Sequence, residues 1–186
     1  RLYYCDWKFS CQWKTLMKKV ERHRYNKEGQ IFQTRTLTFE PYPMTEIESV
    51  IGSNSSSLTP DLVTKKYREE NASNPMFGHC YHSSQALYYL MDTDVLEQRT
   101  AIDYHDCSHW WLVDTTTDKV YDITADQYYH VGQTPPYVDG KKKPWYGWKE
   151  RPHQRSLNLM VRVLGSRLIK DTVTTPKVVE SLDLFL

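Results

Sequence analysis

Three residues of the chain have the types that nucleophilic catalysis by a thiol requires: Cys80, His109 and Asp122. A cysteine attacks only as the thiolate, which the positive end of a helix or a neighbouring imidazolium favours. A histidine can carry the proton, and a carboxylate can hold the imidazole in the correct tautomer. These residues predict a site in which Cys80 is the nucleophile, His109 the base and Asp122 the group that orients the base.

The segment before Cys80 has the composition of a turn that leads into a helix. Residues 74–80 read Asn-Pro-Met-Phe-Gly-His-Cys, and residues 81–91 carry an apolar face at helical spacing. Cys80 is therefore expected in the first turn of a buried helix. Gly78 lets backbone amides approach a reacting carbonyl closely, and Asn74 offers a side-chain donor, so both are predicted to contribute to an oxyanion site.

His109 and Asp122 fall on two segments that the sequence pattern predicts to pair as a hairpin. Residues 109–114 and 119–124 alternate as strands do, and residues 115–118 read Thr-Thr-Thr-Asp, a turn. If His109 and Asp122 share a face, they are cross-strand neighbours within reach of one hydrogen bond. Asp126 is a second candidate to orient His109, with Asp122 then capping a turn.

Other side chains near Cys80 leave alternatives open. His79 and His82 flank the cysteine, so either is an alternative ion-pair partner, and Cys107 is an alternative redox partner. A metal site is a further alternative, although Cys-x-His at 107–109 is too short for the usual zinc spacing and the favoured assignment contains no metal. Its donors would be drawn from His79, Cys80, His82, His105, Cys107 and His109.

Lysines and aromatic residues gather in residues 141–149, Lys-Lys-Lys-Pro-Trp-Tyr-Gly-Trp-Lys. Cations beside aromatic rings can stack on nucleobases or hold a phosphate-bearing ligand. We predict substrate contacts from Lys143, Trp145 and Trp148, together with Trp110 beside the base. The alternative is a solvated basic turn that leads to a packed aromatic anchor, whereas a position over Cys80 would make the loop a substrate lid.

The helices and strands expected before residue 71 are predicted from sequence patterns that are less regular. Residues 11–25 are expected to form a charged helix, 31–39 a strand and 45–50 a short helix. Residues 52–57, Gly-Ser-Asn-Ser-Ser-Ser, read as a loop. A helix is expected over 59–70, because Thr-Pro-Asp at its start combines a capping hydroxyl, a first-turn proline and a carboxylate.

The rest of the chain completes one predicted domain over residues 1–186. Residues 132–154 look like an irregular loop, and Ser156 begins an apolar helix or strand. We divide the domain into an N-terminal extension over 1–70, a catalytic core over 71–170 and an unassigned tail over 171–186. A chain of 186 residues is long enough for one ordinary hydrophobic core.

The bulk composition excludes several classes of protein. The formal net charge is +1, so no overall field draws the chain to nucleic acid or to an anionic membrane. No stretch approaches the roughly 20 apolar residues of a membrane span, and the first residues lack a signal-peptide layout. Four cysteines at uneven spacing fit no disulfide framework. The expectation is a cytoplasmic protein, in the host cytoplasm if the source is viral, without membrane contact.

These motifs together carry a resemblance. Gly78-His79-Cys80 opening a helix, then 109–114 as His-Trp-Trp-Leu-Val-Asp and 120–124 as Val-Tyr-Asp-Ile-Thr, resemble the papain-like and transglutaminase-like cysteine-enzyme core. Residues 122–127, Asp-Ile-Thr-Ala-Asp-Gln, are similar to the Asp-x-Thr-x-x-Gln segment of small YunG-type bacterial and phage proteins. The resemblance covers roughly residues 74–130. It implies an α+β fold with the nucleophile helix packed on a small antiparallel sheet.

The function implied by the resemblance is that of a thiol protease, amidase, deamidase or acyl transferase, which uses no cofactor. The expected ligand is a peptide or another amide-bearing or small-molecule substrate, with nucleic acid the less favoured partner. The alternative is a binding module with an idle triad, in which the Trp/Tyr/Lys loop holds a nucleotide, nucleic acid or protein, for example a phage inhibitor or sponge.

Overall fold

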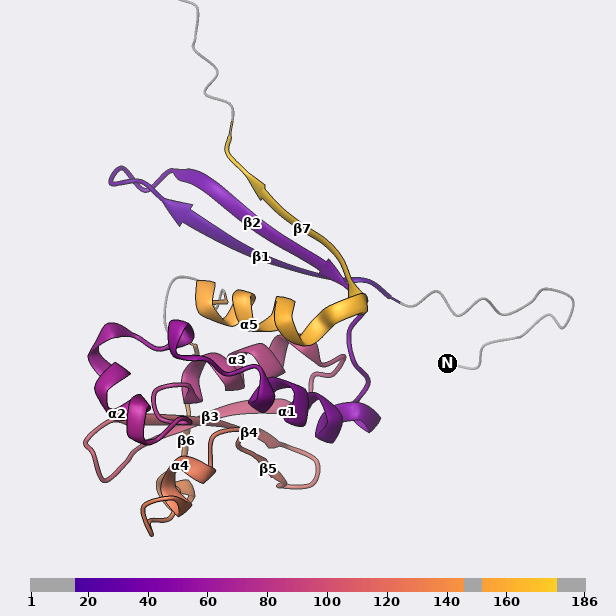
Figure 1. Cartoon of the computed structure of the whole chain (residues 1–186). Coiled ribbons are helices and arrows are strands. Elements are labelled where there is room, and N and C mark those ends of the chain that lie inside the picture. The colour runs from indigo at the N-terminus through magenta and orange to yellow at the C-terminus, as the bar shows by residue number, and fades with distance from the viewer. Residues whose placement is uncertain (1–15, 146–151, 177–186) are drawn as a thin grey trace, which may run out of the picture.

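The computed structural model describes residues 16–145 and 152–176, and it has the α+β architecture that the sequence predicts. Two antiparallel sheets lie on opposite sides of a layer of helices, with α5 between the three-stranded sheet and α3 (Figure 1). This layering buries the apolar faces of both sheets against helices. The site residues come from the lower half of this arrangement.

The four-stranded sheet holds the predicted base. Its strands are β3 (Leu96–Ile102), β4 (Ser108–Asp114), β5 (Val120–Tyr121) and β6 (Lys141–Lys142), in the order β5-β4-β3-β6 with every neighbouring pair antiparallel. β4 is central and almost entirely buried. A central buried strand is a rigid support for a catalytic side chain.

Three helices fill the space between the sheets: α1 (Ile47–Ser56), α3 (Cys80–Leu90) and α5 (Gln154–Leu164). α3 packs on β4 on one side and on α5 on the other. The centre of the core is formed by side chains with 2% exposure or less, among them Leu87, Leu90, Trp110, Leu112, Leu157 and Met160. The first turn of α3 is therefore fixed by the packing of the rest of the helix.

The three-stranded sheet has the order β1-β2-β7, with β1 (Lys18–Tyr25), β2 (Ile31–Phe39) and β7 (Leu168–Thr174). Val20 pairs with Leu37, and both are buried in the core cluster that includes α5. β7 comes from the part of the chain that the sequence left partly unassigned, and it joins the sheet at the edge of β2.

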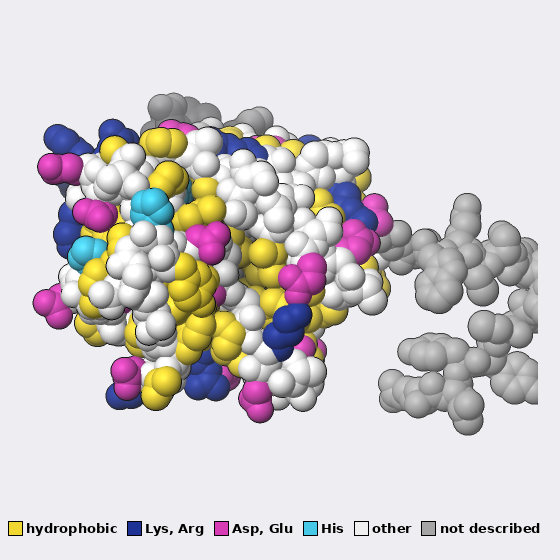
Figure 2. All heavy atoms as spheres, turned by 60° about the horizontal axis from the view of Figure 1, so that its bottom comes forward, with side chains coloured by type: hydrophobic (Ala, Val, Ile, Leu, Met, Phe, Trp, Pro, Cys, Tyr) yellow, Lys and Arg dark blue, Asp and Glu magenta, His cyan; other side chains and the backbone are white. Residues whose placement is uncertain are grey.

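The remaining helices are single turns or little more. They are η1 (Met44–Glu46), η2 (Pro60–Leu62), η3 (Lys65–Tyr67), α2 (Arg68–Ser73), α4 (Asp126–Tyr129), η4 (Tyr137–Asp139) and η6 (Gly165–Arg167). Seen from the α4 side of the molecule, hydrophobic side chains lie among charged ones on the surface (Figure 2). Among the large hydrophobic side chains of the described residues, the most exposed is Val138, in η4.

Two predicted elements are wrong in the part that the structure describes. Residues 18–25 are a strand rather than the end of a helix, because they pair antiparallel with β2 along their whole length, and within the strand Val20 is the buried residue. Residues 52–56 are helical rather than a loop. The hydroxyls of Ser56 and Ser57 donate to the carbonyls of Gly52 and Ser53, four residues earlier, so these side chains are satisfied on the helix itself.

Two further predictions hold in part. The helix expected over 59–70 is broken into η2, η3 and α2, because Val63 and Thr64 have extended backbones. Within 132–154 the described residues are largely irregular but include η4, the short strand β6 and the first residue of α5. The segment that begins near Ser156 is a helix, α5.

Candidate active site

Cys80 is the first residue of α3 and lines a pocket of about 460 Å³. Its thiol donates to the backbone carbonyl of Ser108, with 3.7 Å between sulfur and oxygen. The amides of a helix's first turn have no intrahelical acceptor, so the backbone around Cys80 offers N–H donors and a partial positive charge. Cys80 thus stands at the positive end of a helix, among backbone N–H donors.

Gly78 shapes the turn that delivers the chain to Cys80. Its φ angle is +80°, a backbone conformation that residues other than glycine rarely adopt. A Cβ atom at this position would lie 3.0 Å from the Cβ of Tyr67 and 3.0 Å from Cγ1 of Val63. The site therefore needs glycine both for the backbone conformation and for the space.

His109 lies on β4 and pairs with Asp122. Its Nε2 atom is 2.7 Å from Oδ2 of Asp122, and the two side chains are 1% and 2% exposed. The ring of Trp111 stacks beside the imidazole at 26°, and the ring of Tyr128 meets it edge-on. The imidazole is therefore held in place by its aromatic neighbours as well as by the carboxylate.

Asp122 follows the last residue of β5 and is bonded through both carboxylate oxygens. Oδ1 accepts from the backbone N–H and the hydroxyl of Thr124, and Oδ2 accepts from His109 and from the hydroxyl of Tyr137 at 2.9 Å. These four donors leave the carboxylate one orientation. The carboxylate in contact with His109 is thus that of Asp122, whereas Asp126 is the first residue of α4.

The cross-strand relation differs in detail from the predicted one. β4 and β5 pair only through Leu112 with Tyr121 and Val113 with Val120. In this register Asp122 would follow opposite Trp111, so it reaches His109 along the diagonal and not directly across the ladder. The strand ends early because the side chain of Asp122 bonds the backbone of Thr124 and turns the chain.

The surroundings of His109 favour its charged form. Burial lowers the pKa of the imidazole, but the charge and hydrogen bond of Asp122, joined by the hydrogen bond and charge of Cys80, raise it to about 10. His109 is consequently an imidazolium at neutral pH. The imidazole thus interacts with the Asp122 carboxylate on one side and with the Cys80 side chain on the other.

The two histidines beside Cys80 are in a different state. His79 is 1% exposed, and neither ring nitrogen has a hydrogen-bond partner within the described residues. Burial lowers the pKa of His79 to about 4, and burial followed by the charges of His153 and Arg155 lowers that of His82 to about 3. Both are neutral at pH 7, so neither offers Cys80 the charged partner that His109 does.

Asn74 has a different partner from the one predicted. Its side-chain amide donates to the backbone carbonyl of Gln127 at 2.8 Å, and the residue is 3% exposed. It does not line the pocket that holds Cys80. This hydrogen bond ties the turn before α3 to α4, so Asn74 links the part of the chain that carries Cys80 to the part that follows Asp122.

The four residues predicted to contact the substrate do not lie together at one site. Trp110 lines the Cys80 pocket, but its ring is 1% exposed and stacks on Trp145 at 26°. Trp145 is 3% exposed and belongs to the hydrophobic core. Lys143 is exposed and lines a separate hollow beside Ser108 and β6. Trp148 lies outside the described residues.

Thr124, Gln127 and Tyr137 were given no role from the sequence. Gln127 lines the pocket, and its side-chain amide donates to the carbonyl and hydroxyl of Thr124 and lies 3.4 Å from Nδ1 of His109. Thr124 and Gln127 both stand in the 122–127 segment that carries the resemblance, and this was the available signal. Nothing in the sequence pointed to Tyr137, which reaches Asp122 from η4.

The chain matches no protein-family model, no curated protein and no solved structure. Within residues 16–145 and 152–176, no group of three or more His, Cys, Asp and Glu side chains is arranged to hold a metal ion. None of the helices in this part of the chain has the length and apolar character that crossing a membrane requires. Cys107 is a free cysteine that lines the same pocket as Cys80.

Proposed function

We propose that the protein is a cysteine-dependent hydrolase or acyl transferase that acts on an amide or related acyl bond, with a core of the papain-like or transglutaminase-like type. One observation carries the proposal. A buried His109 is held by Asp122 through one ring nitrogen and lines the same pocket as Cys80 at the start of a helix. Nucleophile, base and orienting group come from three separate elements around one cavity.

In the first half of the reaction, the Cys80 sulfur attacks the carbonyl carbon of the substrate. A C–S bond forms, and the carbonyl oxygen takes the negative charge. Backbone N–H groups of the first turn of α3 are the donors suited to that oxygen. The imidazolium of His109 then gives its proton to the leaving amine, the C–N bond breaks and an acyl-enzyme remains.

In the second half, water or an amine attacks the acyl carbon while His109 takes its proton. The C–S bond breaks, and the thiolate and imidazolium are restored. Because Nε2 is bonded to Asp122, Nδ1 is the ring nitrogen that carries the exchanged proton. Asp122 fixes the orientation of the ring throughout.

The pocket wall suits a substrate with an apolar or aromatic group near the reacting bond. Beside Cys80 and His109, its lining includes the side chains of Tyr67, Phe77 and Tyr81. Rings of this kind bury large apolar surface while leaving room for a polar group at one end.

Wild type and Cys80→Ala should be incubated with a complex mixture of peptides and a primary amine, and the products identified by mass spectrometry. The proposal predicts cleaved, deamidated or amine-bearing peptides with the wild type and with Cys107→Ser, and none with Cys80→Ala. The three product types separate peptidase, deamidase and transferase. Identical product profiles with wild type and Cys80→Ala would contradict the proposal.

A further inference from the structure

A second hollow, of about 840 Å³, opens between the three-stranded sheet and the start of α5. The β1–β2 hairpin extends past the N-terminal end of α5 (Figure 1), and residues of both elements line the hollow. We call it the arginine groove. It is lined by Arg22, Arg24, Gln33, Arg35, His153, Gln154, Arg155, Asp171 and Val173.

The charge of the arginine groove is strongly positive although the whole chain is nearly neutral. Four arginines face one carboxylate among the lining residues. Arg35 is neutralised by that carboxylate, since its Nη2 lies 2.7 Å and its Nε 3.0 Å from the oxygens of Asp171. Arg22, Arg24 and Arg155 have no ion pair within the described residues, so their charges are available to a ligand.

The strand geometry directs these guanidinium groups into the groove. Val20 is buried against α5, and alternate positions of a strand share a face, so Arg22 and Arg24 point to the same side. Arg22 donates to the carbonyl of Pro152 through Nη1, while its Nε is buried without a partner in the described structure. Burial, and then the charge of Arg24, lowers the pKa of Arg22. The arrangement leaves donors and positive charge uncompensated.

The arginine groove adjoins the pocket that holds Cys80. His153 and Arg155 line both, and the ring of His153 lies 4.7 Å from that of His82 in the wall of the Cys80 pocket. α5 begins at Gln154, so the positive end of its dipole adds to the field at this junction. A ligand bound along the groove would therefore lead directly to the site.

We propose that the arginine groove binds carboxylate or phosphate groups of a peptide substrate, so that the enzyme selects amides next to an anionic segment. Guanidinium groups bind both anions bidentately, which favours such a segment over a neutral one. The selection of substrate rests on the proposed function of Cys80. The binding of the anionic segment does not, and the two can be tested separately.

Binding is measured by fluorescence anisotropy with the Cys80→Ala protein and labelled 12-residue peptides built around one Gln. Four peptides differ in the residues on either side of this central Gln. The first carries Glu, the second phosphoserine, the third the neutral residues Gln and Ser, and the fourth Lys. We expect the Glu or the phosphoserine peptide to bind at least about tenfold more tightly than the neutral one. The tighter of the two identifies the anion. A single-stranded DNA of similar length is the competing class of ligand.

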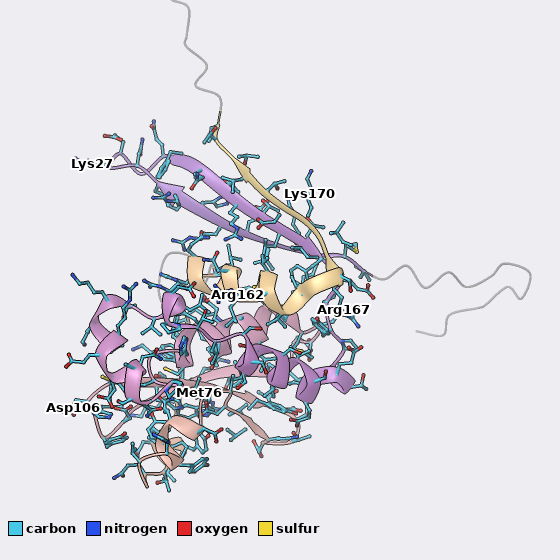
Figure 3. All side chains as sticks on the ribbon, in the orientation of Figure 1. Lys27, Met76, Asp106, Arg162, Arg167 and Lys170 are labelled. Atoms are coloured by element: carbon cyan, nitrogen blue, oxygen red, sulfur yellow. The ribbon has the colours of Figure 1, made fainter. Side chains whose placement is uncertain are left out.

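Two double variants separate the groove from overall charge. Arg24→Gln with Arg155→Gln removes two groove cations, whereas Lys27→Gln with Lys170→Gln removes two cations at the hairpin tip and on β7 (Figure 3). The groove variant is expected to lose the preference for the anionic peptide. The control variant is expected to keep affinity within about twofold, because screened surface charges act weakly.

The link to Cys80 is tested with peptides that carry a chloroacetamide at the Gln position. The thiolate displaces chloride, forming a thioether as the C–Cl bond breaks, so labelling reports how often the bound peptide reaches the sulfur. With wild type, anionic peptides should label Cys80 at least about tenfold faster than neutral ones. The groove variant should lose this ratio. Because Arg155 also lines the Cys80 pocket, each labelling rate of the variant is divided by its own rate with neutral iodoacetamide before the comparison.

The outcomes are distinguishable. Three outcomes would each contradict the proposal that the arginine groove binds anionic peptides: equal binding of anionic and neutral peptides, tighter binding of the DNA, or an unchanged preference in the groove variant. If anionic peptides bind in the groove while Cys80 fails to react even with iodoacetamide, the proposed function fails and the anion site stands. If anionic peptides bind but label Cys80 no faster than neutral ones, the link between the two is refuted.

Discussion

Nε2 of His109 lies 2.7 Å from Oδ2 of Asp122, and both side chains are withdrawn from solvent. A buried charge is stable only when it is paired, and each of these two residues supplies the partner of the other. Asp122 is in turn held by Thr124 and Tyr137. This pair is the most constrained part of the site, and the first prediction concerns it.

Asp122→Asn is expected to lower the pKa of His109 from about 10 by at least about 2 units. The reason is that burial lowers this pKa and the carboxylate is the main group that opposes it. NMR titration of the His109 ring protons, assigned with His109→Gln, measures the shift. An unchanged titration would mean that Asp122 does not set the charge of the imidazole.

Gly78→Ala is expected to destabilise the fold by about 2–4 kcal/mol, because it adds a steric clash to an unfavourable φ angle. Gly132→Ala is the matched control. Gly132 has a φ of +70° but no atom within 4 Å of an added Cβ, so that variant should lose only about 1 kcal/mol. Urea unfolding measures both. Equal losses would show that Tyr67 and Val63 do not constrain the turn.

Asn74→Ala should lower stability by about 1–3 kcal/mol and leave the alkylation rate of Cys80 in the folded protein unchanged. Its amide is the donor to the buried carbonyl of Gln127, which loses its partner in the variant. Urea unfolding and iodoacetamide labelling measure the two effects. A peptide substrate identified for the proposed activity would add the third readout, since a loss of turnover without a loss of stability would support Asn74 as an oxyanion donor.

Stability should fall on both sides of a maximum near pH 6.5. Burial lowers the pKa values of His79, His82 and His153 to about 4, 3 and 4, respectively. As the pH falls, these histidines therefore bind protons in the unfolded chain before they do so in the folded protein, and stability is lost from about pH 6.5 toward pH 4. His109 acts in the opposite direction. Its folded pKa is raised to about 10, so its contribution is complete below about 6.5 and is lost as the pH rises toward 10.

The acid side of this curve can be assigned with His79→Leu. The pKa of His79 is about 2 units higher in the unfolded chain than in the folded protein, and a difference of this size is worth about 3 kcal/mol. At pH 4.5 the variant should therefore regain much of that amount in its free energy of unfolding. His130→Leu, which removes a histidine at an exposed position, is the comparison variant. Urea unfolding at pH 4.5, 6.5 and 8.5 gives the comparison. A flat curve between pH 6.5 and 4.5 would contradict the buried neutral histidines.

The sequence was informative where local pattern and packing agree. The apolar face after Cys80 predicted α3 because the same residues fill the core, and the Thr, Phe and Leu residues in 31–39 predicted β2 with its observed ends. The helix prediction for residues 18–25 is wrong because Leu16, Met17 and Val20 have helical spacing, whereas the chain pairs with β2 across the turn that follows. β7 was missed for a different reason, since its partner β2 lies far earlier in the chain.

The candidate site was predictable in its members but not in its support. Cys80, His109 and Asp122 could be named from residue type and element context, because a helix start and a hairpin are local features. The contact of Tyr137 with Asp122 depends on the path of a loop. The burial of Trp145 in the core, rather than over the pocket, depends on its stacking on Trp110 and its edge-to-face contact with Tyr81. Composition carries neither relation.

The most direct test of the central claim is the rate of iodoacetamide alkylation of Cys80 as a function of pH, followed by mass spectrometry in wild type and His109→Gln. A thiolate maintained by the His109 imidazolium predicts a rate at pH 6 within about twofold of that at pH 8.5. An ordinary thiol loses rate nearly tenfold per pH unit below about 8.5, as His109→Gln should. A wild-type profile that falls in the same way as the variant's would contradict the account.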